Sequence, residues 1–292
     1  MSATAPASLG QWRCDGMRLE LGGRSIFVRT QGSGEALLCI HGFPTASWDF
    51  RRLWPALTER YRVVVIDMLG FGDSDKPAGH RYRIREQAQL QLATLAALGI
   101  ERFDVLAHDY GVSVAQELLA CHNQGTAAAG LSSICFLNGG LYPELHRPLL
   151  MQKLLASPLG PLLARVLDRG AFERSMKRVF GPQTAPSREE LDGFWELFSR
   201  ANGARALPHL IRYMEERRRN RARWVGALEQ STLPLGFICG ALDPISGRHL
   251  AEHLMHALPK MRVRVLEHVG HYPQVEDSAA VLREYLAFRA NP

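Results

Sequence analysis

Long apolar runs are absent from the 292-residue sequence, since none approaches the roughly 20 residues that a membrane-spanning helix needs. The N-terminal segment MSATAPASLGQWRCDG also lacks the charged start and apolar centre of a secretory signal peptide. We therefore expect a cytoplasmic protein without a membrane span.

Cysteine pairs and metal-binding spacings are absent as well. The five cysteines are scattered, odd in number and without CxxC or Cys/His spacing. Cys39, Cys135 and Cys239 lie inside apolar runs, where a buried thiol behaves as a small hydrophobic group. This pattern predicts reduced thiols and no bound metal.

Nucleic-acid motifs are missing too, although the formal net charge of +6 permits acidic partners without requiring them. The segment Arg217–Arg223 is rich in arginine. It could contact acidic lipid or nucleic acid, or it could be the solvated face of a helix beside Glu215 and Glu216. We favour the solvated face, and expect no nucleic-acid partner, because no interleaved aromatic residues accompany the run.

What the sequence does contain is a regular alternation of strand-like and helix-like segments. Short apolar runs, several of them apolar on both faces, predict strands of a buried parallel sheet. Helical patterns separate these runs, which is typical of an α/β sheet covered on both faces. The predicted parallel strands are Ala36–Ile40, Arg62–Ile66, Phe103–Ala107, Leu131–Leu137, Leu235–Cys239 and Val263–Leu266, and the predicted helices are Arg85–Leu98, Val112–His122, Gly247–Ala257 and Ala279–Phe288.

Two features depart from this alternation. The runs Met17–Leu21 and Arg24–Thr30 flank two glycines and predict an antiparallel hairpin that opens the sheet, giving eight strands in all. Residues 140–228 are rich in Leu, Arg and Pro and helix-like throughout. We therefore predict a core in two parts, 1–139 and 229–292, with an inserted helical cap between them; a separate helical domain is the alternative.

A nucleophile elbow is predicted at Ala107–Gly111, between an apolar strand and a helix. The tight turn requires small residues two positions before and after its centre, and Ala107 and Gly111 meet this requirement. The central residue, Asp109, would then face the N-terminal end of a helix, whose dipole favours an anion. The alternative is that Asp109 only caps this helix. His108 should point away from the site and serve packing or hydrogen bonding.

An acid and a histidine follow in the order of the α/β-hydrolase triad. Asp243 comes just after the strand that ends at Cys239, and His271 comes after the strand at Val263. Asp67 and Asp277 are rival acids, but the first precedes the nucleophile in the chain and the second is placed to cap the last helix. His268 is expected at the surface.

The segment His41–Pro44 follows another predicted strand and has the composition of an oxyanion loop. The backbone N–H groups of Phe43 and Tyr110 could together form the oxyanion hole. Two glycines in Gly70–Gly72 suggest a dinucleotide loop, but the third glycine and the acidic ribose ligand are missing. We therefore expect no cofactor.

Five motifs together resemble the epoxide hydrolase and haloalkane dehalogenase branch of the α/β-hydrolases, over nearly the whole chain from about Met17. They are His41–Pro44, Gly70–Ser74, His108–Gly111, Gly240–Asp243 and Gly270–His271. A further set resembles one epoxide-hydrolase-like member of this branch that is associated with membranes, a location we do not carry over because no membrane span is predicted. This set comprises His108–Gly111, Val114–Leu119, Leu137–Gly140, His146–Pro148, Arg223–Leu228 and His271–Gln274.

The resemblance implies a two-step hydrolysis through a covalent ester. Asp109 would attack an electrophilic carbon, and His271, oriented by Asp243, would activate water to hydrolyse the ester. A dehalogenase needs N–H donors for the halide, yet Tyr110 follows the nucleophile where such enzymes have Trp, and Phe43 offers no side-chain donor. An epoxide hydrolase usually has two tyrosines in its cap. Tyr213 and Tyr142 are the candidates, although Tyr213 could equally be a packing residue.

Three hypotheses about function follow from these residues. The first is an epoxide hydrolase acting on a small, apolar, electrophilic substrate, as a monomer or homodimer. The second is a haloalkane dehalogenase or another hydrolase with the same triad. The third is a ligand-binding or signalling protein with little turnover, because a fold alone never proves activity.

Overall fold

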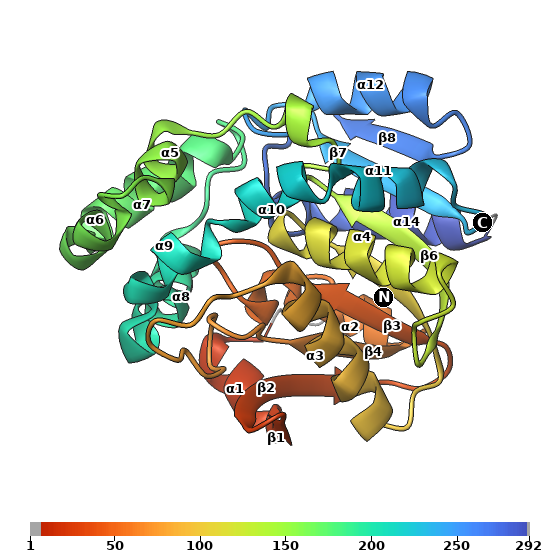
Figure 1. Ribbon diagram of the computed structural model, residues 1–292, viewed down its shortest axis with the longest axis horizontal. Helices are drawn as coiled ribbons and strands as arrows, with labels where there is room; N and C mark the ends of the chain where they lie inside the picture. The colour runs from red at the N-terminus through yellow and green to blue at the C-terminus, as the bar shows by residue number, and fades with distance from the viewer. Residues whose placement is uncertain (1–6, 291–292) are drawn as a thin grey trace.

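An eight-stranded sheet forms the centre of the computed structural model, which describes residues 7–290 (Figure 1). The strand order is β1-β2-β4-β3-β5-β6-β7-β8. β1 and β2 are antiparallel neighbours, β2 is antiparallel to β4, and all other pairs are parallel. The strands are β1 (Met17–Leu21), β2 (Arg24–Gln31), β3 (Ala36–Ile40), β4 (Arg62–Ile66), β5 (Arg102–Ala107), β6 (Gly130–Leu137), β7 (Leu235–Gly240) and β8 (Arg262–Leu266).

The α/β fold class, the opening hairpin and the mostly parallel sheet are therefore confirmed. The strands predicted at Ala36–Ile40 and Arg62–Ile66 match at both ends, and the others differ by one residue at most. Part of the segment interpreted as lacking a signal peptide, residues 1–6, lies outside the described residues.

Helices pack on the sheet from both sides. In Figure 1, α3, α4 and α11 (Arg221–Glu229) lie side by side in front of it and α14 lies behind it. The helices of the core are α1 (Leu9–Cys14), α2 (Trp54–Thr58), α3 (Ile84–Ala97), α4 (Tyr110–Asn123), α12 (Arg248–Ala257), α13 (Pro273–Glu276) and α14 (Ser278–Ala290), with the short 3-10 helix η1 (Ser47–Phe50).

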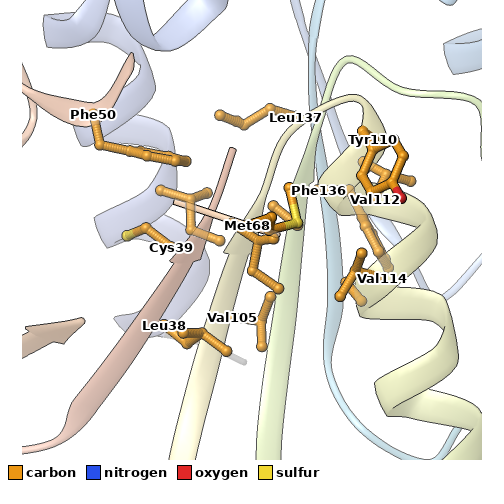
Figure 2. Packing of buried hydrophobic residues seen from close by; sticks show 14 of the residues in the cluster. Leu38, Cys39, Phe50, Met68, Val105, Tyr110, Val112, Val114, Phe136 and Leu137 are labelled. Atoms are coloured by element: carbon orange, nitrogen blue, oxygen red, sulfur yellow. The ribbon is translucent and has the colours of Figure 1, made fainter. Parts of the chain in front are cut away.

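The central strands are buried on both faces, which explains why their sequences are apolar without alternation. In the β3–β5 pair, Leu38 lies opposite Val105, and both are completely buried. Figure 2 shows these side chains on neighbouring strands, with Val112 and Val114 of α4 packed beside the sheet. Each such side chain stabilises the fold by about 1.5–3 kcal/mol relative to an exposed position. The strand ends that hold the candidate site are thus fixed by a rigid core.

Every element between β6 and β7 is helical. The last helix of this insertion, α11, packs against α4, and the indole N–H of Trp224 donates to Glu117 at 2.6 Å. The division of the chain into core and cap at 140 and 228 stays a prediction, since this helix covers the sheet layer. The segments are η2 (Pro143–Leu145), α5 (Leu150–Ala156), α6 (Gly160–Val166), α7 (Arg169–Val179), α8 (Arg188–Ser199), η3 (Arg200–Ala206), α9 (Leu207–Leu210), α10 (Tyr213–Arg219) and α11 (Arg221–Glu229).

Two helices of this insertion begin at side-chain caps that their sequences encode. The carboxylate of Asp168 accepts from the N–H of Ala171 at 2.7 Å at the start of α7. Ser187 and Glu190 form a reciprocal capping box at the start of α8. Glu190 also accepts from Arg52 of the core at 2.7 Å, so α8 is joined to the sheet domain. No helix within residues 7–290 is long and apolar enough to cross a membrane.

Candidate active site

Asp109 lies in the tight turn between β5 and α4, as the elbow motif predicts. Its backbone has φ 46°, a left-handed conformation that typically costs about 1–3 kcal/mol for a residue other than glycine. The turn also packs closely against β3, because a Cβ on Gly111 would lie only 2.5 Å from the carbonyl oxygen of Ile40. This contact is the physical reason for the small residue at position 111.

The carboxylate of Asp109 does not cap α4. Its Oδ1 accepts from the backbone N–H of Phe43 at 2.8 Å, and its Oδ2 lies 3.4 Å from Nε2 of His271. Burial alone would raise the pKa of Asp109, but the hydrogen bond and charge of His271 outweigh burial and hold it well below its usual range. Asp109 is therefore a buried, ionised carboxylate.

The loop that contains Phe43 approaches the elbow closely at Gly42. A Cβ at this glycine would lie 2.6 Å from Nδ1 of His108 and 2.8 Å from Cβ of Asp109. Tyr110 begins α4, so its N–H belongs to the first turn, whose amides have no partners within the helix. The two amides predicted to form an oxyanion hole are thus on the two segments that flank the Asp109 side chain.

His271 connects Asp109 to Asp243. Its Nδ1 lies 2.8 Å from Oδ2 of Asp243. Burial alone would lower the pKa of His271, but the carboxylates of Asp243 and Asp109 outweigh it and raise the pKa to about 10. The imidazole is consequently protonated at neutral pH. Hydrogen bonds and the charge of His271 also lower the pKa of Asp243 to about 2, against the effect of its burial.

Asp243 is held by a set of donors that the sequence did not reveal. Asn138, at the end of β6, donates to Oδ2 of Asp243 at 2.9 Å and accepts from the N–H of Gly240 at 2.7 Å. Ser246 donates to the same oxygen through its hydroxyl at 2.7 Å, and Ile245 donates its N–H to Oδ1 at 2.8 Å. These three residues fix the carboxylate against the imidazole.

The rival acids serve other purposes. Asp67 accepts from the backbone N–H groups of Ser47 at 2.9 Å and Asp73 at 2.7 Å, which holds the loop after β4. Asp277 accepts from the N–H of Ala280 at 2.9 Å and so caps α14. Neither carboxylate is hydrogen-bonded to His271 within the described chain.

The remaining histidines considered in the sequence lie as expected. The ring of His108 is buried, and its Nε2 donates to the backbone carbonyl oxygen of His271 at 2.7 Å. It therefore helps to hold the loop that contains His271. His268 is exposed and lies 3.2 Å from Asp277 at the surface.

An apolar cavity, partly open to solvent, lies between the core and the insertion. The core contributes Phe43, Pro44, Ile245, His271 and Tyr272 to its wall. The insertion supplies the rest, which is almost entirely apolar: Leu149, Met151, Gln152, Leu155, Leu167, Phe172, Ser175, Met176, Val179, Phe198 and Leu207. Such a wall suits a small or medium apolar ligand.

The two candidate tyrosines of the insertion have different surroundings. Tyr213 is buried, with its ring 4.8 Å from the ring of Tyr110, and its hydroxyl has no hydrogen-bond partner within residues 7–290. The hydroxyl of Tyr142 lies 3.4 Å from Glu229, and its ring packs on His253 at 4.6 Å. The structure thus brings Tyr213 to the elbow and leaves Tyr142 beside a different set of residues.

Arg217 is the site residue that the sequence interpretation missed. The proposal of a solvated face for Arg217–Arg223 is wrong at this position, because the Arg217 side chain is buried and donates to the backbone carbonyl of Asp109 at 3.2 Å. Arg218, Arg219 and Arg221 are exposed, as predicted. The available indication was spacing, since Arg217 follows Tyr213 by four residues and so shares its helix face.

Comparisons with known proteins agree with the resemblance found in the motifs. A family model described as alpha/beta hydrolase fold matches residues 35–278. The human mesoderm-specific transcript homolog protein, which the second set of motifs resembles, is 41% identical over 293 residues, covering 96% of this chain and 88% of that protein. The structures of the epoxide hydrolase CorEH and of the haloalkane dehalogenase DbeA from Bradyrhizobium elkani match with TM-scores of 0.77 and 0.79.

The two structural matches extend over most of each chain but at low sequence identity. CorEH is 20% identical, with 94% of this chain and 98% of that chain covered. DbeA is 21% identical, with 95% and 99% covered. At this identity they establish a shared architecture, and substrate class has to be argued from the site.

Proposed function

Because the chain belongs to the α/β-hydrolase family, we propose that it is a hydrolase in which Asp109 forms an alkyl ester with an epoxide. The main support is the buried, ionised carboxylate of Asp109, held between the N–H of Phe43 and the ring of His271. A carboxylate can attack a saturated carbon directly, without a base to activate it. The apolar cavity beside His271 suits a small apolar substrate.

In the first step, Oδ2 of Asp109 is the attacking oxygen, because Oδ1 is already hydrogen-bonded to Phe43. A bond forms from Oδ2 to a carbon of the epoxide, and the bond from that carbon to the ring oxygen breaks. The electron pair goes to the ring oxygen, which needs a proton. Tyr213, whose buried hydroxyl has no partner in the described chain, is the proposed donor.

In the second step, His271 activates water. Ester formation removes the negative charge of Asp109, which is one cause of the raised pKa of His271, so the pKa falls and the imidazole can release its proton. The neutral ring then takes a proton from water, which attacks the ester carbonyl. The resulting oxyanion at Oδ1 faces the N–H groups of Phe43 and Tyr110, each worth about 3 kcal/mol of barrier in comparable sites.

An epoxide is favoured over an alkyl halide by the donors around the elbow. The family resemblance implies that a halide needs side-chain N–H groups beside the nucleophile, and neither Phe43 nor Tyr110 has one. An epoxide instead needs an acidic hydroxyl from the insertion. Tyr213 meets this need, with its ring packed against Tyr110 at 4.8 Å.

The test is intact-mass analysis of the His271→Gln variant after exposure to panels of epoxides and haloalkanes. We expect ester formation without ester hydrolysis, so that a hydroxyalkyl adduct accumulates on Asp109 with epoxides. An alkyl adduct with released halide would favour dehalogenation instead. No adduct from any electrophile would favour a ligand-binding protein.

Two controls accompany this experiment. Asp109→Asn in the same background should abolish the adduct, because the attacking oxygen pair is no longer a carboxylate. His268→Gln, which changes an exposed histidine, should leave turnover unchanged. Retention of the adduct in the Asp109→Asn protein would show that another residue is the nucleophile.

A further inference from the structure

The guanidinium of Arg217 lies inside the site and makes three polar contacts with neutral groups. Nε donates to the hydroxyl of Ser113 at 2.6 Å, Nη2 donates to the backbone carbonyl of Asp109 at 3.2 Å, and Nη1 lies 3.4 Å from Nδ1 of His146. Figure 1 shows the helix of Arg217, α10, beside the N-terminal end of α4. A side chain of the insertion therefore contacts the backbone of the elbow itself.

This burial is costly for a charged group. Removing a cation from water typically costs several kcal/mol, and buried arginines are usually paired with a carboxylate. Among residues 7–290, no carboxylate oxygen lies within the 4.0 Å ion-pair distance of Arg217, although its side chain is 2% exposed. The charge of Arg217 acts instead on the Asp109 carboxylate, whose pKa it helps to lower.

The guanidinium also lies over the ring of Tyr213, one helical turn earlier on α10. The guanidinium carbon lies 4.4 Å from the centre of the Tyr213 ring. A cation over an aromatic face stabilises the ring, and it stabilises a phenolate more than a phenol because of the added negative charge. Burial and the Asp109 carboxylate raise the pKa of Tyr213, and Arg217 acts in the opposite direction.

We infer that Arg217 is a positioning residue for epoxide opening, which orients Tyr213 toward the elbow and stabilises the phenolate formed when Tyr213 gives up its proton. This inference rests on the proposed function. As Oδ2 of Asp109 bonds to carbon and the ring C–O bond breaks, the proton of Tyr213 moves to the ring oxygen. The phenolate is then reprotonated by the proton that His271 releases, which leaves His271 neutral for the second step.

The proton balance closes over the full cycle. His271 starts as an imidazolium, becomes neutral when Tyr213 is restored, and is protonated again by the attacking water. The Asp109 carboxyl group formed by ester cleavage loses its proton to the departing alkoxide, which leaves as the second hydroxyl of a diol. The net reaction consumes one epoxide and one water, with every side chain returned to its starting state.

His146 fixes the orientation of the guanidinium without adding charge. Because Arg217 can only donate, Nδ1 of His146 must accept, and the proton of the neutral ring is on Nε2. Burial, together with the adjacent Arg217, lowers the pKa of His146 to about 3. His146 therefore remains neutral near pH 7, and Arg217 is the cation that faces Tyr213.

The experiment compares two leaving groups in the His271→Gln background, where the ester accumulates. Styrene oxide needs a proton for its leaving oxygen, whereas 2-phenylethyl methanesulfonate does not. We expect Arg217→Met to slow ester formation from styrene oxide by about 100-fold, and from the sulfonate by less than about 3-fold. Arg217→Lys should recover part of the lost rate. In Arg217→Met, the rate of ester formation from styrene oxide should rise more steeply as the pH is lowered.

Each outcome distinguishes the inference from the function on which it rests. Equal slowing with both electrophiles, or no slowing with either, would overturn the role of Arg217 and leave the ester mechanism intact. No ester from either electrophile in the parent His271→Gln protein would remove the proposed function and this inference with it. The matched control is Arg219→Met, which changes an exposed arginine of the same helix, and far-UV circular dichroism checks that each variant folds.

Discussion

The sheet core and the helical insertion contribute to the site in different ways. The core supplies Asp109, Asp243 and His271, each in the turn or loop that follows a parallel strand of the sheet. The insertion supplies Tyr213 and Arg217 from one short helix that has no strand to fix its position. Groups at strand ends are placed by the register of the sheet, whereas groups on the insertion are placed by how one helix packs on another. The core thus holds the residues that we propose as nucleophile, base and orienting acid, and the insertion provides the residues that we assign to the leaving group.

The largest effect should come from the core. Asp109→Asn should reduce turnover by about 10⁶-fold, the loss seen when a nucleophile is removed from a comparable triad. The amide keeps the shape of the carboxylate and can still accept from Phe43, so the fold should be retained. The measurement is steady-state turnover with the best epoxide found, alongside a thermal unfolding curve.

A residual rate within 100-fold of the parent protein would contradict this assignment. Asp277→Asn is the matched control, because Asp277 caps α14 and makes no hydrogen bond to Asp109 or His271 within the described chain. It should alter stability slightly and turnover very little. If both variants lost activity equally, the loss would reflect impaired folding, and it would not support Asp109 as the nucleophile.

The pairing of His271 with Asp243 and Asp109 should also affect the stability of the protein. His271 has its pKa raised from 6.5 to about 10, so it contributes stability that is fully present below pH 6.5 and is lost as the pH rises to about 10. Across this window the unfolding free energy should fall by up to about 1.4 kcal/mol per pH unit because of this one group. His271→Gln should remove that slope, as measured by urea unfolding at several pH values.

The comparison has an internal check. Asp49 is buried, which raises its pKa to about 8, so it titrates within the same window. It is present in both proteins, however, and cancels when the two curves are subtracted. A difference curve that is flat between pH 6.5 and 10 would mean that His271 is not held as an imidazolium in the folded protein.

The insertion should matter for one step only. Tyr213→Phe should slow epoxide opening by about 100-fold, because the ring oxygen would lose its acid, while the ester once formed should be hydrolysed at an unchanged rate. Single-turnover mass analysis separates the two steps. Tyr142→Phe is the matched control, since its hydroxyl lies beside Glu229. Unchanged turnover in Tyr213→Phe would remove this tyrosine from the mechanism.

The same division explains which parts of the molecule could be predicted. The elbow, Asp243 and His271 were found because parallel strands are visible as apolar runs and their carboxyl ends meet at one edge. The strand Ala36–Ile40 was predicted to the residue because it is buried on both faces. Asn138 also lies at a strand end, but it contacts the site only through its hydrogen bond to Asp243, so no motif indicated it.

The insertion was less predictable because its helices are short and their packing partners are far apart in sequence. Arg217 contacts Ser113 across 104 positions of the chain, and nothing in the run Arg217–Arg223 states which arginine faces inward. Composition favoured a solvated helix, and this holds for Arg218, Arg219 and Arg221. The rotation of α10 about its axis, which is set by its contact with the elbow, decides that Arg217 is buried and its neighbours are exposed.

The smallest expected effect tests that last distinction. Arg219 is exposed and pairs with the exposed Glu215 one turn earlier, an arrangement worth about 0.3–0.5 kcal/mol. Arg219→Gln should therefore change the unfolding free energy by no more than about 0.5 kcal/mol. Arg217→Gln should cost several times more, because Ser113 and the carbonyl of Asp109 would lose a buried donor. Urea unfolding of both variants provides the comparison, and equal losses would mean that the burial of Arg217 contributes no more to the fold than an exposed ion pair.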